Sequence, residues 1–270
     1  MVDDYYFFMD FKNLKTQTDG PIATVHFDRP DKANALNYEH LREIKQVCEQ
    51  YQENDQVRVI IFTGSGNHFS SGADLSDPGL EYQVPLVQRR RRMRAGEQAI
   101  QAILDLDQIT IAAWHGGAMG GGACIATACD FRIGAKDSFM QYPEIDIGVN
   151  LMWKSLPLII SLVGPARAKQ LVIGGIRLEA ESLLAWGILD DLVSRSALLD
   201  KAQELAKFYA EKPPIAAQMI KQSINSYSNA LAQSIMHMDV DQNLFASTTE
   251  DRKEAISSYL NKSKPKFTGN

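Results

Sequence analysis

The sequence predicts an α/β protein followed by a helical C-terminal segment. Runs rich in β-branched residues alternate with segments of helical periodicity up to Glu144, and helical patterns dominate after it. The size of the chain is the second observation, because 270 residues that are 45% hydrophobic can bury the core of one large domain with an appended segment.

The first half of the chain has a β-α-β pattern. IATVHFDRP, from Ile22, is a strand bounded by turn residues, and the apolar residues of LREIKQVCEQYQEN recur at helical spacing after a candidate cap, Asn37. VRVIIFTG, from Val57 to Gly64, is a continuous β-branched run of the kind that parallel sheets bury. Its following loop, SGNHFSSGADL, leaves the C-terminal end of a strand, where open α/β folds place ligands.

The remaining elements follow the same reasoning. A helix is expected from Tyr82 to Leu106, then a strand in ITIAAWHG, a turn and helix in GGGACIATACD, and a strand in FRIGAK. Further helices are expected in LMWKSLPLIISLVG, PARAKQLVIGG and EAESLLAWG, with glycines at or near their ends. Three long helical patterns complete the chain, at residues 197–212, 213–246 and 249–262.

Composition excludes several classes of protein. The net charge of -5 gives no global attraction to nucleic acid or to an anionic membrane. The three cysteines form no CxxC pair, so neither a disulfide framework nor a cysteine zinc site is expected, and a reducing cytoplasm fits best. The start, MVDDYYFFMDF, is acidic where a signal peptide is basic, and no apolar run approaches membrane-spanning length. We therefore expect a soluble, uncleaved cytoplasmic protein.

Two loops are candidates for binding an oxygen atom through backbone N–H groups. The glycine-rich stretch Gly116–Gly122 matches no nucleotide motif, but three consecutive glycines at a helix N-terminus leave N–H groups unshielded where the helix dipole favours negative charge. A tight packing turn is the alternative. The second loop, Ser70 to Asp74, also leaves the C-terminal end of a strand, and its small residues allow a substrate to approach the backbone. For Asp74, a capping role is favoured over a catalytic one.

Glu144 is the candidate acid or base. It lies in MQYPEI between aromatic and aliphatic residues, and burial there would raise its pKa toward the range of a general base, although a solvated loop glutamate is the alternative. No nucleophile motif is present, and the five histidines lack metal-binding spacing. His68 and His115 lie beside the two loops, where local packing is the favoured role.

The run Arg89 to Arg94 allows two interpretations. It is either a solvated face of the helix expected from Tyr82 to Leu106 or a contact for phosphate groups.

Together these pieces resemble the crotonase, or enoyl-CoA hydratase/isomerase, superfamily. The matching segments are RPDKANAL from Arg29, FSSGADL from Phe69, Gly116 to Asp130, YPEI from Tyr142, GPARA from Gly164, and AWGIL from Ala185. The resemblance implies a spiral of ββα units at residues 1–200 and a helical trimerisation region at 201–270. It also implies a homotrimer or dimer of trimers that binds acyl-CoA thioesters, with no metal and no cofactor besides the CoA of the substrate.

The resemblance also implies roles for individual residues. The backbone N–H groups of Ala73 and Gly121 would hold the thioester oxygen. Hydratases of this family use two glutamates, whereas this sequence has Cys124 at the first position and Glu144 at the second. A double-bond shift needs only one acid, so the sequence is more similar to the enoyl-CoA isomerases.

Alternative functions stay open at this point. They are hydration, decarboxylation and thioester hydrolysis, as well as a non-catalytic or RNA-binding role for the chain.

Six further residues match substrate-binding positions of the family. Lys32 and Ala33 would lie along the CoA, Met152 and Trp153 would line the acyl pocket, and Tyr259 and Lys262 resemble a C-terminal tail that reaches the CoA of an adjacent subunit.

Overall fold

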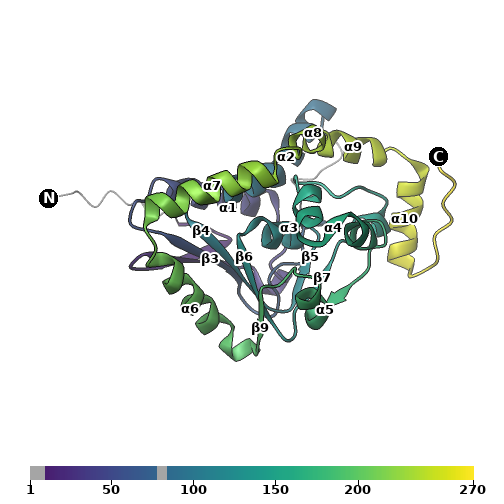
Figure 1. The fold of residues 1–270 in the computed structure, drawn as a ribbon. Coiled ribbons are helices and arrows are strands. Elements are labelled where there is room, and N and C mark those ends of the chain that lie inside the picture. Colours follow the sequence, from purple (N-terminus) through teal and green to yellow (C-terminus); the bar gives the residue numbers. More distant parts are fainter. Residues whose placement is uncertain (1–9, 78–83) are drawn as a thin grey trace.

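Two β-sheets and a surrounding set of helices form the structure, a computed structural model that describes residues 10–77 and 84–270 (Figure 1). The acidic start of the chain, apart from its last two residues, lies outside the described residues, as do the first residues of the helix expected from Tyr82.

The larger sheet has six strands in the order β1-β2-β3-β4-β6-β9. β1 is antiparallel to β2, and every other neighbouring pair is parallel. The strands are β1 (Leu14–Asp19), β2 (Ile22–Phe27), β3 (Val59–Gly64), β4 (Ile109–Trp114), β6 (Phe131–Ala135) and β9 (Asp191–Val193). The four predicted strands β2, β3, β4 and β6 are confirmed. The two edge strands were not predicted, because neither carries a continuous apolar run.

The smaller sheet contains only short strands, in the order β5-β7-β8. They are β5 (Gly117–Met119), β7 (Phe139–Gln141) and β8 (Leu178–Glu179). β5 lies inside the glycine-rich stretch, so that stretch is a strand followed by a helix start rather than a turn alone.

Helices of the first 197 residues pack around these sheets. They are α1 (Tyr38–Gln52), α2 (Leu86–Leu104), α3 (Gly121–Ala128), α4 (Leu156–Val172) and α5 (Ala180–Ala185), with 3-10 turns η1 (Pro30–Lys32), η3 (Ile145–Ile147) and η4 (Arg195–Ala197). Asn37 caps α1 as predicted, since its side chain accepts a hydrogen bond from the His40 N–H at 2.7 Å.

One helix prediction is wrong at its start. Residues 151–155 were expected to be helical, but α4 begins at Leu156, and Trp153 and Lys154 adopt left-handed backbone conformations with φ of 64° and 58°. The Lys154 N–H donates to the Asp239 carboxylate at 2.8 Å. A tertiary contact therefore outweighs the local helical pattern here.

The C-terminal part is helical as predicted, although its middle pattern is divided. Residues 213–246 form three helices instead of one. The helices are α6 (Leu198–Ala210), α7 (Pro214–Ser228), α8 (Gln233–Met236), α9 (Asp239–Ala246) and α10 (Glu250–Asn261). α6 crosses the expected boundary at residue 200 and packs on the large sheet, so the division into core and oligomerisation region stays a prediction.

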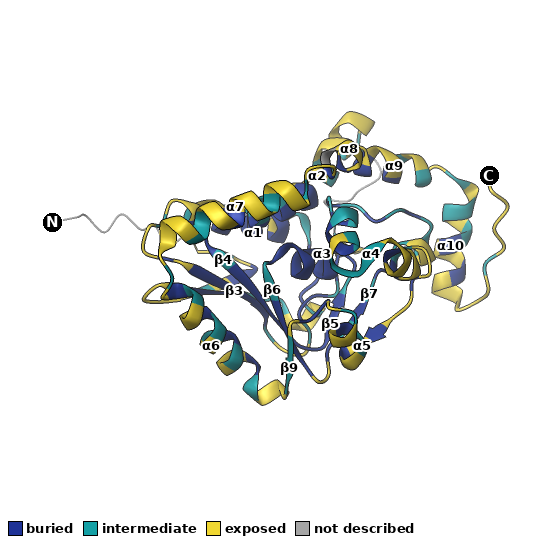
Figure 2. Cartoon of the chain, viewed as in Figure 1, coloured by how far each residue is buried: buried dark blue, intermediate teal, exposed yellow. Residues whose placement is uncertain are grey.

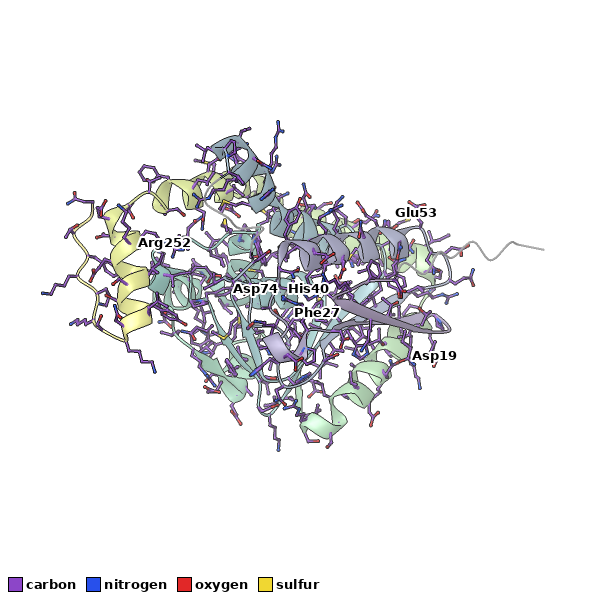
Figure 3. All side chains as sticks on the ribbon, turned by 180° about the vertical axis from the view of Figure 1, so that it is seen from behind. Asp19, Phe27, His40, Glu53, Asp74 and Arg252 are labelled. Atoms are coloured by element: carbon purple, nitrogen blue, oxygen red, sulfur yellow. The ribbon has the colours of Figure 1, made fainter. Side chains whose placement is uncertain are left out.

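The large sheet is covered on both faces. One face, with Ile60, Phe62 and Ala112, belongs to the main core, and the other face packs against Leu198 and Ala202 of α6. α3 is buried along its whole length, whereas α7 and α10 expose much of their surface (Figure 2). Figure 3 shows α10, with Arg252, at the opposite end of the molecule from Asp19, the last residue of β1. Among the described residues, none of the helices combines the length and the apolar character that a membrane-spanning helix needs.

Candidate active site

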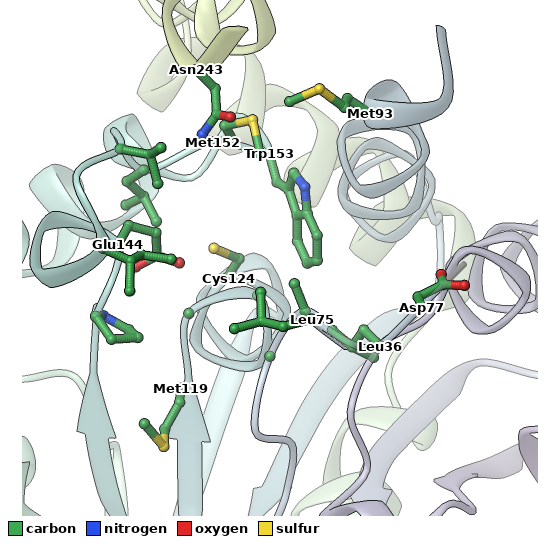
Figure 4. Close-up of a pocket in the computed structure, with 18 of the residues that line it drawn as sticks. Leu36, Leu75, Asp77, Met93, Met119, Cys124, Glu144, Met152, Trp153 and Asn243 are labelled. Atoms are coloured by element: carbon green, nitrogen blue, oxygen red, sulfur yellow. The ribbon is translucent and has the colours of Figure 1, made fainter. Parts of the chain in front are cut away.

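A cavity of about 270 Å³ lies where the carboxyl ends of β5 and β7 meet the helices α2, α3 and α10. Both candidate loops and Glu144 line it, together with apolar side chains from the loop before α4 (Figure 4). Its lining residues include Leu36, Ser71, Gly72, Ala73, Leu75, Asp77, Met93, Met119, Gly120, Gly121, Cys124, Glu144, Met152, Trp153, Asn243 and Tyr259.

The backbone N–H of Ala73 points away from the segment around Leu36, with which Ala73 pairs. Ala73 forms a parallel bridge with Leu36, in which the Leu36 N–H donates to the Gly72 carbonyl and the Asp74 N–H donates to the Leu36 carbonyl. Within residues 10–77 and 84–270 the Ala73 N–H has no acceptor. It is thus one donor left available on a residue that lines the cavity.

The second available donor is Gly121, the first residue of α3. The first N–H groups of a helix have no partner inside it, and the Gly121 N–H has none elsewhere in the described chain. Gly120, just before it, has a φ of 47° and a ψ of -116°, a conformation that L side chains rarely adopt. The glycine therefore allows the sharp turn that exposes this helix end to the cavity.

The two loops lie close together because hydrogen bonds connect them. The Ser70 N–H donates to the Gly117 carbonyl at 3.1 Å, and the Met119 N–H donates to the Ser70 carbonyl at 3.0 Å. A Cβ on Gly72 would lie 2.5 Å from the Met119 carbonyl oxygen and 3.1 Å from the Gly121 nitrogen. Ala73 and Gly121 are thus neighbours in the same cavity, and their binding of one oxygen atom stays a prediction.

Glu144 lies directly beside this pair. A Cβ on Gly120 would be 2.6 Å from Glu144 Oε1, and Figure 4 shows the carboxylate at the cavity wall opposite Asp77. Glu144 Oε2 is buried and has no hydrogen-bond partner. Burial, reinforced slightly by the negative charge of Asp146, raises the pKa of Glu144 from 4.5 to about 7. The solvated-loop alternative is excluded for this carboxylate.

Cys124 lines the same cavity from the first turn of α3. Burial, with the nearby Glu144 charge second, raises the pKa of its thiol well above the usual value. The thiol is therefore protonated at neutral pH and is not a base.

The other polar candidates make local contacts. Asp74 accepts from the Ser76 N–H and hydroxyl at 3.1 and 2.6 Å and from Arg29 at 2.9 Å. Burial alone would raise the pKa of Asp74, but these hydrogen bonds outweigh it and lower the pKa. His68 Nδ1 accepts from the Gly117 N–H at 3.0 Å, and His115 Nε2 lies 3.1 Å from the Gly66 carbonyl oxygen. None of the three lines the cavity, which supports the capping and packing roles favoured for them.

The arginines of the run Arg89 to Arg94 lie in two different environments. Arg90 pairs with Asp241 at 2.5 Å and Arg94 with Glu97 at 3.4 Å, whereas Arg89 and Arg92 line the cavity. The ion pairs of Arg90 and Arg94 fit the interpretation of a solvated helix face, whereas a phosphate contact by Arg89 and Arg92 stays a prediction.

The sequence matches the model of one known family over most of its length. The enoyl-CoA hydratase/isomerase profile covers residues 17–270. The chain belongs to this family.

Relatives within the family catalyse different reactions. The chain is 28% identical to the short-chain-enoyl-CoA hydratase of Clostridium acetobutylicum over 257 residues, covering 95% of this chain and 97% of that protein. It is also 28% identical to the 1,2-epoxyphenylacetyl-CoA isomerase of Escherichia coli over 249 residues, covering 92% and 95%.

A solved structure agrees. The enoyl-CoA hydratase of Bacillus anthracis matches with a TM-score of 0.75 at 28% identity, covering 96% of this chain and 100% of that chain. The fold is therefore the crotonase fold, with its C-terminal helical region, and the chain is a crotonase-family enzyme whose specific reaction these similarities do not define.

The six expected substrate-binding residues do not all lie in the cavity. Met152, Trp153 and Tyr259 line it, and Tyr259 does so in its own chain. Lys32 and Ala33 lie beside it, because their carbonyl groups accept hydrogen bonds from Ser71. Lys262 is exposed at the end of α10 and is not among the lining residues.

Several lining residues were missed by the sequence reasoning. Asn243, Ser247 and Arg252 come from α9, α10 and the turn between them, and the Arg252 guanidinium donates to the Ile147 carbonyl oxygen just after Glu144. Only the helical periodicity of this region is visible in the sequence, and it does not tell which face meets the cavity.

Proposed function

We propose that this enzyme shifts the double bond of an enoyl-CoA, with Glu144 as the single acid and base. The observation that carries the proposal is the buried, unpaired carboxylate of Glu144, whose pKa of about 7 suits proton transfer at neutral pH. It lies beside Gly120, next to the available N–H of Gly121.

The reaction follows from this arrangement. The thioester oxygen accepts hydrogen bonds from the N–H groups of Ala73 and Gly121. Glu144 takes a proton from carbon 2 of a 3-enoyl-CoA, and the electron pair moves into a dienolate whose oxygen charge the two N–H groups stabilise. The protonated Glu144 then returns the proton to carbon 4, which gives the conjugated 2-enoyl-CoA. No proton or atom is gained or lost overall.

Hydration is the second candidate, because relatives such as that of Clostridium acetobutylicum are named hydratases. Hydration needs one group to activate water and another to protonate carbon. The only other carboxylate among the described lining residues is Asp77, which accepts from the Tyr38 N–H at 2.6 Å and lies across the cavity from Glu144 in Figure 4. Cys124, at the position of the first glutamate, carries a protonated thiol. These facts favour the double-bond shift.

The CoA part of the substrate is proposed to run past the 32–33 segment toward Tyr259. Ser71 connects that segment to the cavity, and Tyr259 is 61% exposed at its rim. Arg89 and Arg92 supply positive charge on the lining for the phosphates of CoA. Lys262 is proposed to meet CoA from the end of α10.

A homotrimer, or a dimer of trimers, is proposed as the assembly. Its support is a set of exposed large apolar side chains on α7 and the residues after it, because such clusters mark interaction surfaces. The exposed residues are Ile215, Met219, Ile220, Ile224, Tyr227 and Leu231. Light scattering coupled to size-exclusion chromatography would detect the assembly, and Ile224→Glu should yield monomers if α7 forms the contact.

The function is tested by two variants assayed with a 3-enoyl-CoA. Formation of the conjugated product is followed by its ultraviolet absorbance. Cys124→Ala should keep activity within a few fold of wild type, while Glu144→Gln should lose it. Loss of activity in both variants would instead indicate a two-group mechanism that includes the thiol.

A further inference from the structure

The indole of Trp153 fills the space between α2 and α3. A Cβ on Gly96 of α2 would lie 2.0 Å from indole Cε2, and a Cβ on Gly121 of α3 would lie 2.0 Å from indole Cζ3. Both helices therefore carry glycine where the ring touches them, and the side chain is only 7% exposed. Figure 4 shows the indole pointing into the cavity between Met93 and Cys124.

The surrounding structure holds Trp153 in place. Its backbone and that of Lys154 are left-handed, and the Lys154 N–H is bound by the Asp239 carboxylate. The partly buried Lys154 ammonium contacts Glu97 at 3.3 Å and Gln101 at 2.9 Å, both on α2. Because both its backbone and its ring are held in place, the Trp153 side chain forms a rigid boundary of the cavity, which we call the Trp153 wall.

This wall stands beside the atoms that would hold the thioester. The ring contacts Gly121, whose N–H is one of the two proposed oxygen donors. An acyl chain that starts there cannot pass between α2 and α3. The remaining cavity, about 270 Å³, is smaller than the roughly 300–1,000 Å³ typical of sites for drug-sized ligands.

We propose that Trp153 is a specificity-determining residue that restricts the enzyme to acyl-CoA substrates with short acyl chains. The proposal rests on the proposed binding of acyl-CoA, but not on which reaction follows.

The test measures binding of saturated acyl-CoA thioesters, which undergo no double-bond shift. The affinity of the wild-type protein for acyl-CoA should increase with acyl-chain length, starting from acetyl-CoA, until the chain reaches the indole. For longer chains the affinity should stay constant or decrease. Each methylene buried before that point is expected to improve affinity about fourfold. Isothermal titration calorimetry with acetyl-, butyryl-, hexanoyl- and dodecanoyl-CoA gives this profile.

Trp153→Leu should extend the profile by opening the space between the two glycines. Dodecanoyl-CoA is expected to bind this variant about tenfold or more tightly than wild type, which corresponds to two additional buried methylenes. Trp153→Phe, which keeps a ring, should give an intermediate profile. Trp186→Leu is the matched control, because Trp186 packs beneath Arg167 outside the cavity and its loss should leave the profile unchanged.

Binding of butyryl-CoA shows that each variant is folded. If Trp153→Leu does not fold, the binding profile of Trp153→Phe tests the proposal instead. Superimposable profiles for wild type and the folded Trp153 variants would overturn the proposal while leaving the double-bond shift untouched. If the Trp153 variants bind longer acyl-CoA thioesters but the wild-type protein does not isomerise 3-enoyl-CoA, the role of Trp153 in chain-length selection is supported and only the proposed double-bond shift is rejected.

Discussion

Replacing Glu144 by Gln changes one atom at the centre of the site. The amide keeps the shape of the side chain beside Gly120 but cannot take up a proton. General acid-base catalysis contributes about 10² to 10⁴-fold. Because Asp77, the other carboxylate among the described lining residues, lies across the cavity and the Cys124 thiol stays protonated, we expect a loss in kcat near the upper end of this range, with KM changed by only a few fold.

The pH dependence gives an independent measure of the same group. A base must be ionised to accept a proton, and burial raises the pKa of Glu144 to about 7. The rate of wild type should therefore increase with pH through about 7 and then level off, and this limb should be absent from the residual activity of Glu144→Gln.

Initial rates with a 3-enoyl-CoA, measured between pH 5 and pH 9, provide the assay. Glu181→Gln, an exposed glutamate of α5, is the control and should behave as wild type. Activity of Glu144→Gln within tenfold of wild type, or an unchanged pH limb in that variant, would refute the role assigned to Glu144.

Four further predictions concern stability and the shape of the site. Because the folded-state pKa of Glu144 is raised, the stability that this group contributes is present at low pH and is lost as pH rises from about 4.5 through 7. Urea unfolding should therefore show that Glu144→Gln is more stable than wild type by up to about 3 kcal/mol at pH 8 but not at pH 4. Identical unfolding curves of the two proteins at both pH values would contradict this prediction. Gly120→Ala should lower kcat about a hundredfold, because its Cβ would meet the Glu144 carboxylate, and an unchanged kcat would argue against that contact. Thr249→Ala removes the N-cap of α10 and should lower the free energy of unfolding by about 1 kcal/mol, which is measured by thermal unfolding. An unchanged Tm would contradict this prediction. Cys124 should resist iodoacetamide at neutral pH in the native protein, and rapid alkylation seen by mass spectrometry would contradict its raised pKa.

The elements that sequence reasoning found are those with long periodic patterns. β3 is rich in β-branched residues and buried at all six positions, and α1 combines an Asn37 cap with a strong apolar stripe. β5, β7 and β8 contain two or three residues each, too few to show a period. They are held by pairing with distant segments, which the local sequence does not reveal.

The candidate site was predictable only in part for the same reason. Ala73, Gly121 and Glu144 were identified from loops at strand ends and from the family resemblance, and the structure brings all three to one cavity. The conformation of Trp153 was not predictable, because it depends on Asp239, which is 86 residues further along the chain. Helical periodicity at that point favoured the wrong local structure.

The measurement that tests the central claim most directly uses isotopically labelled water. The protein is incubated with a short 3-enoyl-CoA in water enriched in oxygen-18, and the products are identified by mass. We predict a 2-enoyl-CoA of unchanged mass, with no oxygen-18 in the product, and no reaction in Glu144→Gln. A 3-hydroxyacyl-CoA that carries oxygen-18 as the main product would show that the enzyme adds water and would contradict the single-carboxylate double-bond shift.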